Sequence, residues 1–174
     1  MNRITVDIPE NTIGDWHVQR VTGDSSNIYS LAFDRPIGGP DGEPYGTYAF
    51  MTHTRNGRKH PVMQDTHLKY AEHQPLWDGA TGHVLIGGLG IGFVNCKLIE
   101  MPHVLSVTII ENSQEVIDLV WPYCPKDERF SLVHADIDTW NPPEGSHWNY
   151  AWLDTWINNN SIKDHEEYIQ MLLS

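Results

Sequence analysis

Short runs of apolar and β-branched residues alternate with turn residues through the first third of the chain. Pro and Gly crowd residues 36–44, which excludes a regular element there. Asn56-Gly57 is typical of a two-residue hairpin turn, because both central positions of such a turn need a positive φ. The pattern predicts a small antiparallel β-layer over residues 1–64, with strands at residues 4–8, 16–22, 28–33, 47–54 and 59–64.

From residue 65 onward, continuous Val, Ile and Leu runs alternate with amphipathic helical stretches. The runs predict strands at residues 83–86, 104–110, 130–134 and 150–153. Helices are expected at residues 65–77, 93–101, 113–121 and 162–173, and Asp65 is expected to cap the first of them. Since such alternation is typical of a mostly parallel sheet covered on both faces, residues 65–174 are predicted to form an α/β unit.

The composition agrees with a folded and acidic protein. The 174 residues include 11 Lys and Arg against 23 Asp and Glu, which gives a net charge of −12 with His neutral. Apolar residues make up 40%, enough to build a core at this length. No nucleic acid is expected as a partner, because affinity for phosphates comes from Lys and Arg. A small molecule, neutral or cationic, is the expected ligand.

The sequence also predicts the cellular compartment of the protein and argues against a metal site. No apolar stretch approaches the roughly 18 residues that cross a bilayer, and the first residues lack the apolar core of a signal peptide. The two cysteines, Cys96 and Cys124, have no CxxC spacing, and the histidine spacings match no metal-ligand motif. We therefore expect a cytoplasmic protein with no membrane partner, no metal and no disulfide framework.

The clearest motif is Gly88-x-Gly90-x-Gly92, between a predicted strand and a predicted helix. Glycines at such a position let the chain turn tightly and let a ligand approach the backbone amides. The dinucleotide fingerprint GxGxxG does not fit, because Phe93 stands where its third glycine belongs. A P-loop is excluded because no Gly-Lys-Ser/Thr is present. The spacing GxGxG, followed by an acid after the next strand, resembles class I S-adenosylmethionine-dependent enzymes. A glycine-rich turn that binds no ligand is the competing interpretation.

Three carboxylates follow the predicted strands after this loop. Glu111 ends the strand roughly 20 residues beyond the glycines, where an acid accepts hydrogen bonds from ribose hydroxyls. Asp136 and Asp154 follow the next two strands, and all three are expected to meet at the carboxyl edge of the sheet. Trp152 is placed to contact a cation with its ring. A solvated loop acid and a plain core tryptophan are the competing interpretations of Asp136 and Trp152.

These motifs resemble the spermidine synthase-like branch of the class I S-adenosylmethionine-dependent transferases. The similarity extends over residues 47–156 and rests on Gln64-Asp65, Tyr70-Ala71-Glu72, the glycine loop, Val107–Ser113, Ala135-Asp136 and Leu153-Asp154-Thr155. It implies an α/β, Rossmann-like sheet of the class I methyltransferase type that binds S-adenosylmethionine, preceded by a small antiparallel β-layer.

The resemblance also implies roles for single residues. Glu111 would bind the ribose, Asp136 the adenine and Asp154 the reacting end of the cofactor. Gln64 is expected to contact the cofactor as well. Tyr70 is a candidate catalytic residue beside the acceptor, although a position on the helix surface fits it equally well.

Two departures from the family pattern matter. Gly90 stands where spermidine synthases carry the Asp that holds the aminopropyl amine, which argues against aminopropyl transfer. The chain also ends at Ser174, where the sheet of the family continues with further strands. We therefore expect a sheet shortened after its fourth strand, whose exposed edge another subunit covers, and hence a homo-oligomer.

The leading expectation is methyl transfer from S-adenosylmethionine to a small-molecule acceptor. The first alternative is aminopropyl transfer, or another route that releases methylthioadenosine. The second alternative is a non-catalytic interaction or assembly module on the same fold. Methyl transfer predicts S-adenosylhomocysteine as a product, the first alternative predicts methylthioadenosine, and the second predicts no turnover.

Overall fold

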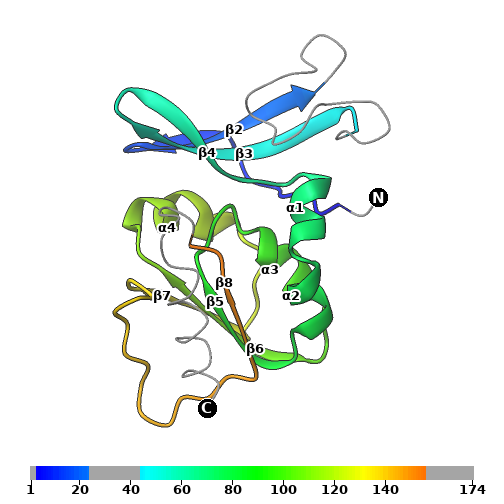
Figure 1. Ribbon diagram of the computed structural model, residues 1–174, viewed down its shortest axis with the longest axis vertical. Coiled ribbons are helices and arrows are strands. Elements are labelled where there is room, and N and C mark those ends of the chain that lie inside the picture. Colours follow the sequence, from blue (N-terminus) through cyan, green and yellow to red (C-terminus); the bar gives the residue numbers. More distant parts are fainter. Residues whose placement is uncertain (1–2, 24–43, 156–174) are drawn as a thin grey trace.

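The computed structural model describes residues 3–23 and 44–155, which form two stacked layers (Figure 1). The upper layer is an antiparallel sheet in the order β1-β2-β3-β4. Its strands are β1 (Asn11–Ile13), β2 (Trp16–Gly23), β3 (Gly46–Arg55) and β4 (Arg58–Gln64). The expected hairpin turn between β3 and β4 is confirmed, with φ of 51° at Asn56 and 71° at Gly57. The predicted strand at residues 28–33 lies outside the described residues.

The predicted strand at residues 4–8 is wrong, although its apolar side chains are buried. Val6 and Ile8 lie in the core, at 3% and 1% exposure, but the segment has no regular secondary structure. The amide of Val6 donates to the Asp65 side chain instead of to a neighbouring strand. The first strand of the sheet is β1, which the apolar pattern does not reveal.

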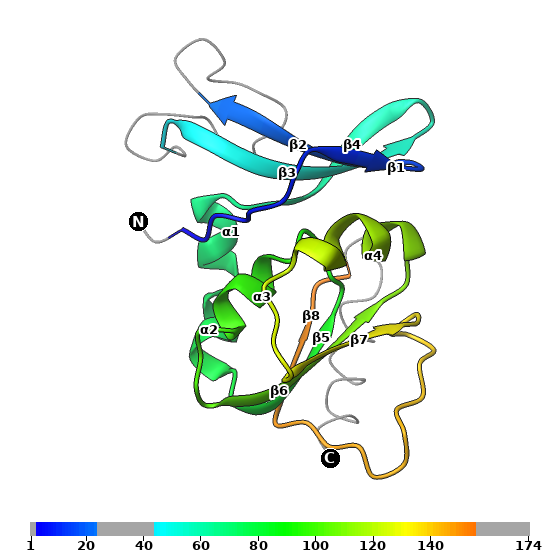
Figure 2. The same cartoon turned by 180° about the vertical axis from the view of Figure 1, so that it is seen from behind.

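The lower layer is a parallel sheet in the order β7-β6-β5-β8. The four predicted strands are confirmed as β5 (Gly82–Gly87), β6 (Val104–Glu111), β7 (Phe130–His134) and β8 (Tyr150–Leu153). The chain moves outward from β5 through β6 to β7, then returns to the other side of β5 as β8 (Figure 2). In open α/β sheets, ligands bind at the carboxyl ends of the strands beside such a reversal of strand order.

In the described part of the chain, four short helices accompany the strands. They are α1 (His67–Glu72), α2 (Gln74–Gly79), α3 (Phe93–Leu98) and α4 (Gln114–Val120), and a 3₁₀ turn follows at Trp121–Tyr123. The predicted helices at residues 93–101 and 113–121 correspond to α3 and α4. The predicted helix at residues 162–173 lies outside the described residues. Among the described residues, no helix has both the length and the apolar character needed to cross a bilayer.

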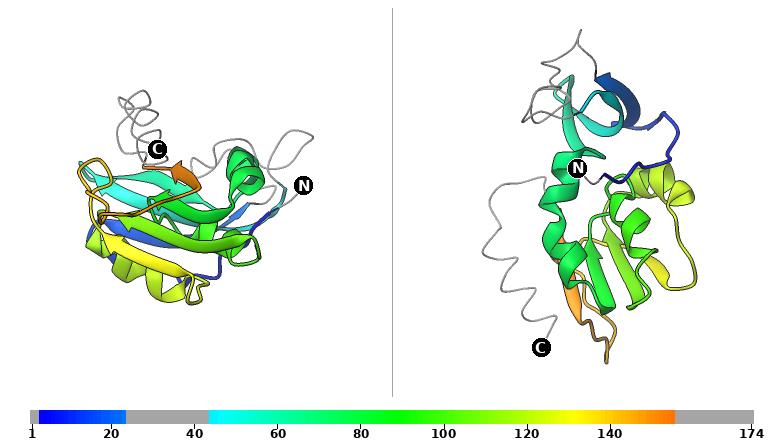
Figure 3. Two further views of the ribbon diagram at one scale, coloured as in Figure 1. Left: turned by 90° about the horizontal axis from the view of Figure 1, so that it is seen from below. Right: turned by 90° about the vertical axis from the view of Figure 1, so that its right-hand side faces the viewer.

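The helix predicted at residues 65–77 consists of two helices that meet at His73. Pro75 occupies the first turn of α2 and has no amide hydrogen with which to continue the ladder of α1. The expected cap at Asp65 is also wrong, because Thr66 is the N-cap and its hydroxyl accepts from the amide of Lys69 at 3.3 Å. Together α1 and α2 connect the two layers (Figure 3).

One large core joins the two layers. Val84 and Ile86 on one face of the parallel sheet pack with side chains of α2, α3 and α4. The same cluster continues into the β-layer through Trp16 and Met51, so the antiparallel sheet rests on the carboxyl end of the parallel sheet. The other face of the parallel sheet carries Leu85, packed against residues of the β7–β8 connection.

A buried carboxylate fixes how the two layers meet. Asp65 is fully buried, and its Oδ1 accepts from the amide of Ala49 in β3 at 2.8 Å. Its Oδ2 accepts from the amide of Val6 at 3.0 Å, and Arg3 forms an ion pair with Oδ1 at 3.2 Å. Asp65 therefore joins the N-terminal segment, the β-layer and the start of α1.

Replacing this carboxylate should destabilise the protein. In Asp65→Asn, one side-chain atom can still accept, but the amide NH₂ faces a buried backbone N–H and Arg3 loses its counter-ion. We expect the free energy of unfolding to fall by about 3 kcal/mol. Urea unfolding followed by circular dichroism measures this change.

Asp78→Asn is the matched control, because Asp78 is exposed and accepts from Gln74, and an Asn oxygen can do the same. It should change the stability by no more than about 0.5 kcal/mol. Equal unfolding midpoints for the two variants would contradict the role of Asp65.

Candidate functional site

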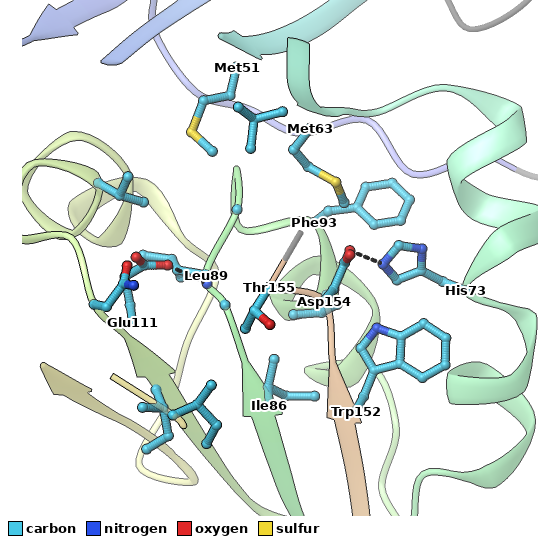
Figure 4. A pocket seen from close by; sticks show the side chains of 18 of the residues that line it. Met51, Met63, His73, Ile86, Leu89, Phe93, Glu111, Trp152, Asp154 and Thr155 are labelled. Atoms are coloured by element: carbon cyan, nitrogen blue, oxygen red, sulfur yellow. Dashed lines mark hydrogen bonds and ion pairs between the residues drawn. The ribbon is translucent and has the colours of Figure 1, made fainter. Parts of the chain in front are cut away.

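A pocket lies between the carboxyl edge of the parallel sheet and the β-layer (Figure 4). Met51 and Met63 of the β-layer lie above the glycine loop, and Ile86 of β5 lies below it. Most of the other lining residues are also apolar. Within the described ranges, the ionisable side chains that line the pocket are His73, Glu111 and Asp154.

The glycine loop follows β5 and supplies bare backbone to this pocket. Gly88 and Gly90 line it with φ of 94° and 54°, values that L side chains rarely adopt. A Cβ at Gly88 would lie 2.8 Å from the carbonyl oxygen of Asp154, so the loop and the end of β8 approach closely. Gly92 lies outside the pocket lining. A Cβ there would meet Cys124 Sγ, so this position needs a glycine for close packing.

Glu111, at the end of β6, holds the loop in place. Its Oε2 accepts from the amide of Leu89 at 2.9 Å (Figure 4), and its Oε1 accepts from the amide of Ser113 at 2.9 Å. The residue is 9% exposed and lines the pocket. A carboxylate offers about four lone-pair sites, so each oxygen can accept a second hydrogen bond from a ligand.

Asp154 follows β8 and lies on the opposite side of the loop from Glu111 (Figure 4). Its Oδ2 is 3.4 Å from Nε2 of His73, and its side chain is 24% exposed toward the pocket. The His73 ring is almost completely buried among aromatic side chains. It stacks on Trp77, with Phe93 and Trp152 at centroid distances of 5.3 Å.

His73 is the ionisable residue of the pocket lining that the sequence does not single out. It stands at the junction of α1 and α2, and its partner Asp154 comes from the far end of the described chain. The local sequence carries one hint only: Pro75 breaks the helix and leaves His73 at a helix boundary.

The remaining predicted site residues lie outside this pocket lining. Asp136 is exposed, and its Oδ1 accepts from the amide of Asp138 in its own turn at 3.1 Å. Gln64 is buried at the end of β4. Tyr70 packs against Trp77 and lines a separate surface hollow that includes Arg3. The structure therefore brings Gly88, Gly90, Glu111 and Asp154 together and leaves Asp136, Gln64, Tyr70 and Gly92 elsewhere.

The two cysteines lie near the loop but are not nucleophiles at neutral pH. Burial raises the pKa of the Cys96 thiol to about 11 and that of the Cys124 thiol to about 12. Both are therefore protonated at neutral pH, and the thiolate is the reactive form. Neither cysteine is among the residues that line the pocket.

Comparison of the chain with protein-family models and with curated proteins gave no match. An assignment of function therefore rests on the geometry of the pocket.

The close approach at Gly88 can be tested against a second glycine with a similar backbone. Gly57 has a φ of 71° and open space around a Cβ, whereas a Cβ at Gly88 meets a backbone oxygen. Gly57→Ala should cost about 1 kcal/mol from its left-handed backbone alone. Gly88→Ala should cost about 3 kcal/mol, because the loop must also move away from β8. Chemical denaturation measures both, and equal losses would argue against the close contact.

Proposed function

We propose that this protein is a methyltransferase with a Rossmann-like sheet of the class I type, which uses S-adenosylmethionine to methylate a small molecule. One observation carries the proposal. Glu111 and Asp154 flank a glycine loop at the carboxyl ends of parallel strands, beside the point where the strand order reverses.

The lining fits an adenosine on the Glu111 side of the loop. Glu111 would accept hydrogen bonds from the two ribose hydroxyls through the lone pairs that Leu89 and Ser113 leave available. Ile110 and Ile137 offer apolar contacts for the flat face of a base. The bare backbone at Gly88 and Gly90 leaves room for the ligand to approach the chain.

The lining fits a positively charged sulfur on the Asp154 side. Asp154 supplies a carboxylate there, and the neighbouring Trp152 supplies an aromatic ring that attracts cations. The indole Nε1 of Trp152 is buried without a hydrogen-bond partner among the described residues. A buried donor of this kind needs an acceptor, which a polar group of a ligand can supply.

When bound, S-adenosylmethionine supplies a methyl group already activated by its positive sulfur. The residues of the chain then have to position the acceptor and exclude water. Proximity alone supplies roughly 7–11 kcal/mol of such a barrier. Met51, Met63 and Phe93 enclose this part of the pocket with apolar surface, and Asp154 is the group that orients the acceptor.

The same geometry disfavours aminopropyl transfer. A Cβ at Gly90 would lie 3.3 Å from Cγ of Met63, so an apolar side chain covers the position where spermidine synthases carry an acid. The amine of an aminopropyl group would find no second carboxylate there.

Binding of the cofactor tests the proposal directly. Isothermal titration calorimetry should detect binding of both S-adenosylmethionine and S-adenosylhomocysteine. Glu111→Ala should weaken both affinities at least tenfold, about 1.4 kcal/mol, because the ribose hydroxyls lose their acceptor.

Glu144→Ala removes an exposed carboxylate outside the pocket and should leave both affinities unchanged. Circular dichroism must show that each variant is folded. Unchanged affinity in Glu111→Ala would refute the ribose role, and absence of binding by the natural protein would refute the proposed function.

The identity of the nucleoside product distinguishes methyl transfer from aminopropyl transfer. The protein, S-adenosylmethionine and a pool of small hydroxyl, thiol and amine compounds should yield S-adenosylhomocysteine, which mass spectrometry identifies. Methylthioadenosine would instead indicate transfer of the aminopropyl group. Binding without either product would favour a non-catalytic module.

A further inference from the structure

The hydrogen bond at one nitrogen of His73 determines what the other nitrogen presents to Asp154. Nδ1 lies 2.9 Å from the carbonyl oxygen of Lys69, and a carbonyl oxygen only accepts. Nδ1 therefore carries a hydrogen. In a neutral imidazole, Nε2 is then a bare lone pair, and this lone pair faces Oδ2 of Asp154 at 3.4 Å.

Two lone pairs that face each other in a buried site repel each other, whereas one proton placed between them forms a hydrogen bond. Nε2 of His73 has no hydrogen-bond partner within the described part of the chain, and the aromatic rings around it exclude water. One proton between Nε2 and Oδ2 converts the repulsion into a charge-assisted hydrogen bond. The geometry therefore favours a pair that holds a single proton.

The other charged groups near the pair are already engaged. Glu111 is the third ionisable group of the lining, and both of its oxygens accept backbone amides. On the helices packed around the ring, Lys69 donates to Glu72 in α1, Gln74 donates to Asp78 in α2, and Lys97 of α3 lies 3.9 Å from Glu100. The proton balance of this end of the pocket therefore depends on His73 and Asp154.

We propose that His73 and Asp154 act as one proton-holding pair that balances the charge of the cofactor. The pair is anionic while a sulfonium occupies the pocket, and it holds one proton while the pocket is filled by the neutral thioether. This inference rests on the proposed function, and it deepens it by naming the class of acceptor.

The transfer then conserves charge within the pocket. The nucleophilic atom of the acceptor forms a bond to the methyl carbon, and the carbon–sulfur bond breaks with its electron pair left on sulfur. The proton of the acceptor passes to Asp154 and is shared with Nε2 of His73. A positive sulfur and an anionic pair become a neutral thioether and a neutral pair, so no charge is left unbalanced in an apolar site.

This balance defines the acceptor. It is a neutral molecule whose nucleophilic atom carries a removable proton: a hydroxyl, a thiol or an uncharged amine. A tertiary amine or a thioether has no such proton and would leave a new cation in the pocket. Asp154 is the group that contacts the acceptor, and His73 is a positioning residue that acts through it.

Proton release on binding tests the pair without any acceptor. Calorimetry at pH 7.5 in phosphate and in Tris, two buffers with different ionisation enthalpies, gives the number of protons released by each ligand. S-adenosylmethionine should release more protons than S-adenosylhomocysteine, with a difference on the order of one. A sulfonium expels the shared proton, and a thioether does not.

Two variants remove the pair, and one control keeps it. His73→Phe and Asp154→Asn should both abolish the difference between the two ligands. If His73→Phe does not fold, Asp154→Asn gives the same readout, because its side chain is partly exposed at the pocket. His60→Phe makes the same substitution at an exposed histidine of β4 and should preserve the difference.

The outcomes separate this inference from the function on which it rests. If neither nucleoside binds, the proposed function fails. If both bind and release equal numbers of protons, the cofactor site stands and the proton-holding pair is overturned. Nitrogen-15 spectra of labelled histidine give a second readout: Nε2 of His73 should be protonated with S-adenosylhomocysteine and unprotonated with S-adenosylmethionine.

Discussion

The two layers of this protein depend on one buried carboxylate. Asp65 accepts hydrogen bonds from the N-terminal segment and from β3 while it stands at the start of α1. A buried carboxylate without these partners would be very costly, so arrangements that separate the layers are strongly disfavoured. The same arrangement sets Met51, two residues beyond Ala49 in β3, above the glycine loop. The apolar residues that cover the pocket are therefore positioned by the hydrogen bonds of Asp65, which lies outside the pocket lining.

The parts of the fold that could be predicted are those in which local sequence decides the structure. Continuous apolar runs gave the four parallel strands, because a strand covered on both faces has no polar side. The segment at residues 4–8 has the same appearance, but the amide of Val6 is taken by a side chain from a distant part of the sequence. Burial could be predicted there and hydrogen bonding could not. The split between α1 and α2 was not predicted, although Pro75 is a local signal for it, because its effect on the hydrogen-bond ladder is local.

The candidate site residues also fall into those that the sequence could place and those that it could not. Glu111 and Asp154 could be placed together because the ends of parallel strands share an edge. Asp136 follows the same rule, yet its carboxylate accepts an amide of its own turn, a choice that depends on the exact path of the loop. His73 could not be found, because its importance comes from a carbonyl one turn before it and a carboxylate from another strand. Such a role exists only after folding.

If the proposed methyl transfer holds, the pairing of His73 with Asp154 solves a problem that a pocket with a fixed negative charge would have. A carboxylate of fixed charge beside a sulfonium stabilises the reactant, and that stabilisation is lost as the positive charge disappears during transfer. Interactions that are stronger in the ground state than in the transition state raise the barrier. In an apolar enclosure the effect is large, because little solvent screens it. A carboxylate that gains a proton in step with the loss of charge avoids this penalty. An imidazole held in one tautomer by the Lys69 carbonyl is suited to keep that proton.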